Sequence, residues 1–457
     1  MVDGPRDMPD SQAAARKGFD GFLRRVDTDA LKVVRRLLGA GHEAYLVGGC
    51  VRDIYLGKQP KDFDVATSAT PESIRRLFRN SRVIGRRFKL AHVFFGPKII
   101  ETATFRSAPR EATEGEDLLI RTDNEWGSVE DDAMRRDFTV NGLFFDVDAR
   151  NVVDFVDGMG DLDEGLIRTI GKPEVRFRED PVRMIRAVKF AARLDFDFEL
   201  ETWRSLLDVA PDIEKASRAR LLEEVYKLMR DGSSRRSFEL LLETKLLKGI
   251  LPSYVKLFGP TTHDAREALR DAMIEAEDDL PPGEQASPAR LLWRYLDALD
   301  MTIRGTGHVP VNGVLLAVLF APLLVDDEEI QSRQQLDRRI EQLMAPVGGA
   351  LGIARRDREM ARQILMATRR MLVTTGKRRS NLTDRDYFHD ALIFLGISVQ
   401  ATGDGKSELG RWKRMASAQP EAGAEPENNR RRRRRGGRKR RKPRGGGDGR
   451  RPRPSDG

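Results

Sequence analysis

The sequence predicts an α+β fold in which a small mixed-sheet head precedes an all-α neck and body, and three observations support this prediction. Short β-branched and aromatic segments occur only within the first 165 residues. After Pro181 the apolar residues recur at helical spacing instead. A strongly basic segment then ends the chain. At 457 residues the protein is long enough for roughly two to four such modules.

Short apolar runs predict strands, and longer periodic stretches predict helices. The expected strands are residues 43–47, 62–66, 92–96, 99–105 and 143–147. The expected helices are residues 27–40, 71–78, 181–194, 219–231, 235–248, 288–300, 312–323 and 356–374. Thr70 before Pro71 is a typical N-cap with proline in the first turn.

These changes of pattern divide the chain into five expected segments. They are a flexible N-terminus (1–26), a catalytic head (27–165), a helical neck (166–255), a helical RNA-binding body (256–415) and a disordered Arg-rich tail (416–457).

The positive charge of the protein is concentrated in its tail. Residues 428–457 hold 15 Arg and Lys against 2 Asp, a net of +13, so the other 427 residues carry a net of −4 toward the total of +9. A glycine- and proline-interrupted basic segment cannot bury a core and attracts polyanions. RNA is therefore the expected partner, and a merely solubilising extension is the alternative.

The sequence also predicts a cytoplasmic protein without a membrane partner. No apolar run reaches the length of a membrane span, and the acidic N-terminus lacks the apolar stretch of a secretory signal. The single cysteine, Cys50, excludes an internal disulfide and fits a reducing compartment. We expect Cys50 to be a small packed thiol.

The first chemical motif combines two glycines with two carboxylates. Asp62 and Asp64 alternate with apolar residues, so on a strand both carboxylates point to one face and offer hard oxygen ligands to a cation. Gly48 and Gly49 leave the backbone open to a phosphate, and Arg52 follows one turn later. Together these residues predict metal-dependent chemistry on a nucleoside triphosphate.

A second motif, residues 135–141, places phosphate- and metal-binding groups on a short turn. Arg136, Asp137 and Asn141 supply a guanidinium, a carboxylate and an amide in close succession.

A third motif, residues 179–187, allows two interpretations. Asp180 before Pro181 could simply cap the helix that follows. Alternatively, Asp180 and Arg183, about one turn apart, present an acceptor and donors to the edge of a nucleobase.

In this order, the motifs at 48–53, 61–64, 135–141 and 179–187 resemble the signatures of class II nucleotidyltransferases, which include CCA-adding tRNA nucleotidyltransferases and bacterial poly(A) polymerases. Residues 84–93 and the Arg-rich tail are similar to bacterial poly(A) polymerases in particular. Lys89 stands where arginine is frequent, and Cys50 occupies a variable position. The basic residues of that segment, Arg86, Arg87, Lys89 and His92, either bind phosphate, rigidify the neck or form a solvated loop.

The resemblance implies a polymerase β-like head that uses two divalent ions, Mg²⁺ or also Mn²⁺, with ATP as substrate. Asp62 and Asp64 would be both catalytic residues and metal ligands. Asp137 would be the third catalytic carboxylate, and Glu101 remains the other candidate.

The resemblance also implies that the nucleotide is bound by Gly48, Gly49, Arg52, Arg136, Asn141, Asp180 and Arg183. In this scheme the glycines and Arg52 cradle the triphosphate. Asp180 and Arg183 read the base, but adenine and cytosine offer them the same pattern.

Three functions are compatible with the resemblance. The leading one is a template-independent poly(A) polymerase that transfers AMP to RNA 3′-ends and releases pyrophosphate. The alternative is a CCA-adding or A-adding tRNA nucleotidyltransferase. The third, a catalytically idle RNA-binding protein, is disfavoured because Asp62, Asp64 and Asp137 are all present. Protein partners and oligomeric state are not predicted.

Overall fold

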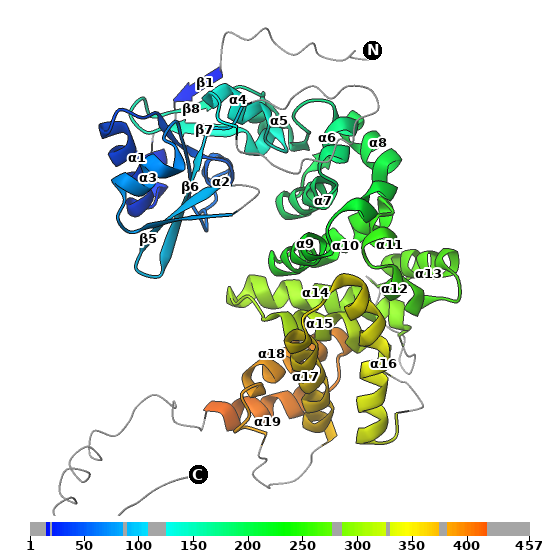
Figure 1. The fold of residues 1–457 in the computed structure, drawn as a ribbon. Coiled ribbons are helices and arrows are strands. Elements are labelled where there is room, and N and C mark those ends of the chain that lie inside the picture. The colour runs from blue at the N-terminus through cyan, green and yellow to red at the C-terminus, as the bar shows by residue number, and fades with distance from the viewer. Residues whose placement is uncertain are drawn as a thin grey trace, which may run out of the picture.

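A computed structural model of the chain describes residues 15–18 (backbone only), 21–85, 89–107, 125–276, 286–325, 330–373 and 382–417. The predictions for Arg86, Arg87 and the basic tail beyond residue 417 lie outside these ranges. The described elements follow an arc, with the strand-containing head at one end, the first helices after it in the middle and the last helices at the other end (Figure 1).

The head contains an eight-stranded mixed sheet in the order β1-β8-β7-β2-β3-β6-β5-β4. Only β3 and β6 are parallel among these neighbours, and the connection between them includes a helix and two strands. The strands are β1 (Ala15–Gly18), β2 (Ala44–Val47), β3 (Asp64–Thr67), β4 (Ser81–Ile84), β5 (Leu90–Phe95), β6 (Lys98–Thr104), β7 (Leu143–Asp146) and β8 (Asn151–Asp154).

Both faces of this sheet are covered by apolar side chains. Alternation along the strands sends Leu46 and Val65 into the main core, and sends Val47 and Ala66 into a second cluster on the opposite face. The helices α1 (Thr28–Gly39) and α2 (Gly49–Tyr55) contact the sheet, and α4 (Val129–Met134) contributes Ala133 to the second cluster. Packing on both faces therefore holds the strands, and the polar residues at their ends, in fixed positions.

Local hydrogen bonds explain where the helices of the head begin. The Asp27 side chain accepts from the backbone N–H of Asp29 and Ala30 at the start of α1. Thr70 accepts from the N–H of Ser73 at the start of α3 (Pro71–Leu77). The predicted helices at 27–40 and 71–78, and the N-cap role of Thr70, are confirmed.

Described residues of the N-terminal segment pack against the head. β1 pairs with β8, and the 3₁₀ helix η1 (Phe22–Arg25) carries a fully buried Phe22. The ring of Phe22 stacks on Phe145 with 3.8 Å between centroids. Residues 15–18 and 22–25 therefore complete one edge of the head, and the expected flexibility of the N-terminus stays a prediction.

From residue 158 on, the regular structure of the described residues is helical apart from a two-stranded parallel pair, β9 (Leu166–Ile167) and β10 (Asp197–Phe198). The longer helices are α5 (Gly158–Glu164), α6 (Pro173–Glu179), α7 (Val182–Leu194), α8 (Leu200–Val209), α9 (Arg218–Arg230), α10 (Ser234–Glu243), α13 (Thr262–Glu275), α14 (Pro288–Thr306), α15 (Asn312–Phe320), α16 (Arg333–Leu351), α17 (Arg355–Val373), α18 (Phe388–Thr402) and α19 (Lys406–Ser417). Two short ones, α11 (Leu246–Ile250) and α12 (Pro252–Val255), connect α10 to α13.

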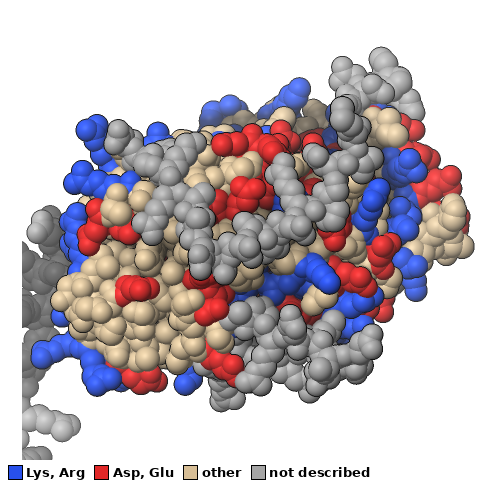
Figure 2. Space-filling model, turned by 90° about the horizontal axis from the view of Figure 1, so that it is seen from above, with Lys and Arg blue, Asp and Glu red and all other residues tan. Residues whose placement is uncertain are grey.

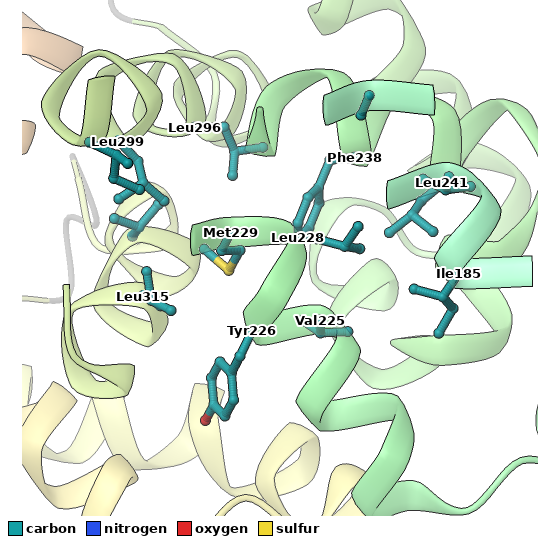
Figure 3. Packing of buried hydrophobic residues seen from close by; sticks show 14 of the residues in the cluster. Ile185, Val225, Tyr226, Leu228, Met229, Phe238, Leu241, Leu296, Leu299 and Leu315 are labelled. Atoms are coloured by element: carbon teal, nitrogen blue, oxygen red, sulfur yellow. The ribbon is translucent and has the colours of Figure 1, made fainter. Parts of the chain in front are cut away.

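A continuous apolar core joins the middle helices to the last ones. Leu228 and Met229 of α9 lie in one cluster with Phe238 of α10 and Leu296 of α14 (Figure 3). Phe238 is fully buried, so truncating it to alanine should cost roughly 3–5 kcal/mol of stability. Helices α9 and α10 of the neck therefore both pack against α14 of the body.

One predicted helix is divided in two. Residues 235–248 form α10 and α11, and the break falls at Lys245, whose φ of 64° is left-handed. Such a backbone conformation cannot continue a right-handed helix.

The surface of the described part has mixed charge. Lys and Arg alternate with Asp and Glu over the face seen in Figure 2, without one large area of a single sign. Among the described helices, none combines the length and the apolar character needed to cross a bilayer.

Candidate active site

A row of polar side chains crosses three neighbouring strands of the head. Asp64 is the first residue of β3 and lies opposite Val47 on β2 and Glu101 on β6. Glu101 in turn lies opposite His92 on β5, with 3.5 Å between His92 Nε2 and Glu101 Oε1. The row thus places Glu101 beside Asp64 on one face of the sheet, although the two residues are far apart in sequence.

The carboxylates of this row lie close enough to repel one another. The side chain of Asp64 is partly exposed, but neighbouring residues surround its carboxylate. This partial desolvation raises the pKa of Asp64 to about 6. The charges of Glu101 and Asp62 raise the same pKa further, and Arg136 opposes them. A bound cation would relieve this repulsion.

These residues fit a magnesium site that substrate oxygens complete. Within the described residues, no three His, Cys, Asp or Glu side chains are arranged to hold a metal ion by themselves. Mg²⁺ commonly takes only one or two protein carboxylates and fills its other positions with water and substrate phosphates. Asp62, Asp64 and Glu101 are the oxygen donors available on this face.

The first glycine leaves room for an arginine next to the carboxylates. Gly48 has a φ of 72°, and a Cβ there would lie 3.2 Å from Nη1 of Arg136. The N–H of Gly48 donates to the carbonyl of Leu143 at 3.0 Å, so it is not available to a phosphate. Arg136 lies over the ring of Phe144 and is held by Asp132 at 2.9 Å. The guanidinium of Arg136 is therefore fixed beside Asp64.

Arg52 is a buried connection between elements and does not face solvent. It is 2% exposed, bonds Asp53 through two nitrogens at 2.9 and 2.6 Å, and donates to Asn141 at 2.5 Å. Asp53 also accepts from Arg193 of α7 at 3.0 Å, and Arg52 lies over the ring of Phe190. The structure thus brings Arg52 and Asn141 together and ties α2 to the neck.

Asp137 is neutralised by an arginine from the neck. Its carboxylate accepts from Arg186 of α7 at 2.6 Å and from Asn141 at 3.3 Å. Burial alone would raise the pKa of Asp137, but the charge and hydrogen bond of Arg186, assisted by Asn141, lower it to about 2. Asp137 is therefore ionised and paired, whereas no described cation forms an ion pair with Asp62 or Asp64.

Asp180 faces a different arginine from the one that the sequence suggested. Both of its carboxylate oxygens accept from Arg220 of α9, each at 2.7 Å. The N-cap residue of α7 is Pro181, and no side chain of that residue caps the helix. The fork of Arg220 matches the two oxygens, and a charge-assisted pair is stronger than a cap bond.

The side chain of Arg183 is held by two residues of α6. It donates to Glu179 at 2.7 Å and to the carbonyl of Arg176 at 2.9 Å. Arg176 also bonds Glu179 and donates to the carbonyls of Arg135 and Arg136, each at 2.7 Å. This chain of contacts connects the turn at 135–141 to the expected base-reading motif.

Four arginines in these contacts were not assigned a role from the sequence: Arg176, Arg186, Arg193 and Arg220. The sequence did contain a signal for Arg186 and Arg193, because both follow Arg183 at helical spacing on α7. Arg176 and Arg220 come from α6 and α9, and only the tertiary fold brings them to the site.

The head is a mixed sheet with two aspartates at the start of a central strand, a third carboxylate on the next strand and arginines around a glycine turn. This combination defines a nucleotidyltransferase. Comparison with known protein families agrees with this class. Residues 44–168 match the poly A polymerase head domain, residues 195–257 match a probable RNA- and SrmB-binding site of polymerase A, and residues 328–445 match the polymerase A arginine-rich C-terminus.

Curated relatives narrow the class to one family. Poly(A) polymerase I of Salmonella typhimurium is 37% identical over 412 residues, which are 87% of this chain and 84% of that protein. A CCA-adding enzyme of Lactobacillus gasseri is 35% identical over 293 residues, 62% of this chain and 71% of that protein. The chain therefore belongs to the bacterial poly(A) polymerase family, as its motifs predicted.

Solved structures share the architecture. The CCA-adding enzyme of Bacillus stearothermophilus in complex with CTP aligns with a TM-score of 0.59 at 24% identity, covering 85% of this chain and 80% of that chain. This likeness confirms the predicted α+β head followed by helical domains.

Proposed function

We propose that this protein is a template-independent poly(A) polymerase, which transfers AMP from ATP to the 3′-hydroxyl of RNA. In this reaction the 3′-oxygen bonds to the α-phosphorus of ATP, the bond from that phosphorus to the bridging oxygen breaks, and pyrophosphate leaves. The observation that carries the proposal is the row of Asp64 and Glu101 beside Asp62, next to the fixed guanidinium of Arg136.

Asp62, Asp64 and Glu101 would hold the divalent ions, with Mg²⁺ as the expected metal. When bound, the ions would supply activation of the 3′-hydroxyl and neutralisation of the triphosphate. The geometry supports Glu101 as the third metal-facing carboxylate because it neighbours Asp64 in register. Asp137 would then act by orienting Arg186 and Asn141, since both already bond it.

Arg136 and the turn at Gly48 and Gly49 would receive the triphosphate. Arg136 offers a charged donor beside the carboxylates, and the absent side chain of Gly48 gives a phosphate the space to approach it. Arg52 would support this turn from behind, because its donors already bond Asp53 and Asn141.

Asp180 and Arg183 would read the base. Asp180 would accept from an amino group and Arg183 would donate to a ring nitrogen, a pattern that adenine provides. Both residues already have protein partners, so base binding requires an exchange of hydrogen bonds with Arg220 and Glu179. Such an exchange loses less free energy than exposing unpaired charges would.

AMP addition is better supported than CCA addition. The poly(A) polymerase relatives align over 87% of the chain, whereas the Lactobacillus gasseri CCA-adding enzyme aligns over 62%. The match of residues 328–445 to the arginine-rich C-terminus of polymerase A supports the same activity. The expected cytoplasmic location stays a prediction.

The deciding experiment supplies purified protein and Mg²⁺ with an unstructured RNA or with a tRNA lacking its CCA end, and adds ATP or CTP separately. Long ladders on the unstructured RNA with ATP alone are expected. Addition of only a few nucleotides to the tRNA alone, with CTP used first and ATP afterwards, would instead identify a CCA-adding enzyme.

A further inference from the structure

The body contains a groove of about 600 Å³ far from the carboxylates of the head. Its walls come from the start of α16, the second half of α17 and the turn before α18, all at the end of the arc opposite the sheet (Figure 1). A volume of this size accommodates a ligand of roughly one or two nucleotides. The whole groove lies within the segment that matches the arginine-rich C-terminus of polymerase A.

Among the described residues, the charged side chains that line the groove are all arginines. They are Arg333, Arg362, Arg369 and Arg370, and no described Asp or Glu lines it. Arg362 is bound by Glu359 at 2.7 Å and by Asp337, so its charge is largely balanced. Arg333 and Arg369 are exposed and form no ion pair with any acid in the described ranges. The groove therefore favours an anionic occupant.

The rest of the lining suits a flat, partly apolar group. Leu336, Met366 and Val373 contribute apolar surface, and the half-buried Tyr387 contributes an aromatic ring. Arginines around an aromatic and apolar floor form the combination that binds single-stranded nucleic acid, with phosphates on the cations and a base against the ring. An acidic peptide would satisfy the charges but would not need the ring.

We propose that this groove binds a single-stranded segment of the RNA substrate upstream of its 3′-end. The inference rests on the proposed function, because RNA is the polyanion that the enzyme would hold during AMP transfer. The groove and the carboxylates lie at opposite ends of the described chain (Figure 1). Only an RNA long enough to reach both sites gains affinity from the groove, and shorter RNAs bind the head alone.

The test compares Arg369→Glu and Tyr387→Ala with two matched controls. Arg356→Glu makes the same charge change at an exposed position of α17 outside the groove, and Tyr387→Phe keeps the ring. Dissociation constants are measured for oligo(A) of about 6 and about 40 nucleotides over a series of salt concentrations. We expect each groove variant to weaken binding of the long RNA roughly tenfold, with normal binding of the short one. Both controls should resemble the unaltered protein, and Arg369→Glu should lower the salt slope by about one.

Three outcomes would overturn the proposal. Equal losses for short and long RNA would mean that the groove does not act at a distance from the head. An equal loss in Arg356→Glu would mean that only the overall charge matters. Unchanged binding of the long RNA in both groove variants would mean that the groove does not bind RNA and has another ligand, such as an acidic peptide. AMP transfer to the short RNA is measured in parallel, and its absence in the unaltered protein contradicts the proposed function without affecting the binding result.

Discussion

Arg220 donates to both carboxylate oxygens of Asp180, and the two distances are each 2.7 Å. The pair joins α9 to the turn between α6 and α7, and the side chain of Arg220 is 37% exposed. A planar guanidinium fixes the direction in which a carboxylate presents its lone pairs. Arg220 therefore determines how Asp180 would meet a nucleobase.

Replacing Arg220 by lysine should reduce base selectivity. A single ammonium cannot hold both oxygens, so Asp180 gains rotational freedom. We expect the ratio of kcat/KM for ATP to that for CTP to fall roughly threefold to tenfold. Steady-state kinetics with each nucleotide on one RNA measure this ratio. Arg218→Lys, at an exposed position on the same helix, is the control, and an unchanged ratio in Arg220→Lys would show that Arg220 is not needed to orient Asp180.

Removing either aspartate of the central strand should abolish AMP transfer without abolishing RNA binding. Asp62→Asn and Asp64→Asn keep the size of the side chain but remove a negative ligand. We expect kcat to fall by more than about 100-fold, while the dissociation constant for RNA stays within about twofold. Glu72→Gln, at an exposed position on α3, controls for loss of an acid in the head. Full activity in either aspartate variant would refute the metal site.

The roles of Glu101 and Asp137 can be distinguished by how the activity of each variant depends on the Mg²⁺ concentration. If Glu101 is the third metal-facing carboxylate, Glu101→Gln should raise the Mg²⁺ concentration for half-maximal activity roughly tenfold. Asp137→Asn should lower kcat but leave that concentration unchanged, because Asp137 is paired with Arg186. Titration of each variant with Mg²⁺ makes the comparison. The reverse pattern would return Asp137 to the metal site.

The pair of Asp137 and Arg186 should also stabilise the fold in a pH-dependent way. The pKa of Asp137 falls from 3.8 to about 2 because Arg186 and Asn141 overcome the effect of burial. A carboxyl with a lowered pKa stabilises the folded state fully above its unfolded pKa and loses this effect as the pH falls through its folded pKa, here from about 4 to about 2. The contribution at neutral pH is roughly 2 kcal/mol.

Asp137→Asn should therefore unfold more easily than the unaltered protein at pH 7, and the difference should narrow below about pH 4. Urea unfolding at a series of pH values measures the free energies of unfolding. A difference that stays constant down to about pH 3 would mean that the ionised carboxylate is not the stabilising species.

Deleting residues 428–457 should weaken RNA binding mostly at low salt. The deletion removes 15 Lys and Arg, each of which can release a counterion when it neutralises a phosphate. We expect a lower affinity together with a shallower dependence of log Kd on log salt. If the slope is the same in the full chain and in the deletion variant, the tail does not contact the RNA.

The sequence was most informative where local pattern decides structure. Alternation predicted the strand at Asp64, and the Thr70-Pro71 pair predicted the start of α3, because both effects involve only neighbouring residues. The edge strands β1 and β4, and β8 next to β1, were missed, since their partners in the sheet stabilise them more than their own composition does. The residue types of the site were identified in the same local way.

The partners of the site residues could not be predicted. Arg52 was expected to meet phosphate, but its position under α7 pairs it with Asp53 and Asn141. Asp180 was expected beside Arg183, and it bonds Arg220 instead. Each of these pairings depends on how one helix packs on another, and a single sequence carries little information on such long-range contacts.

The only cysteine of the protein makes the chain convenient for single-site labelling. Cys50 is 2% exposed, its Sγ lies 3.4 Å from the carbonyl oxygen of Val47, and burial raises the pKa of its thiol to about 12. Maleimides and iodoacetamides react with exposed thiolate, so they should leave the folded protein unmodified. One cysteine introduced at Arg356 and another in the head at Glu72 would then carry a donor and an acceptor fluorophore on an otherwise silent background. Such a doubly labelled enzyme would report in real time whether the two ends of the arc approach each other as the poly(A) product grows.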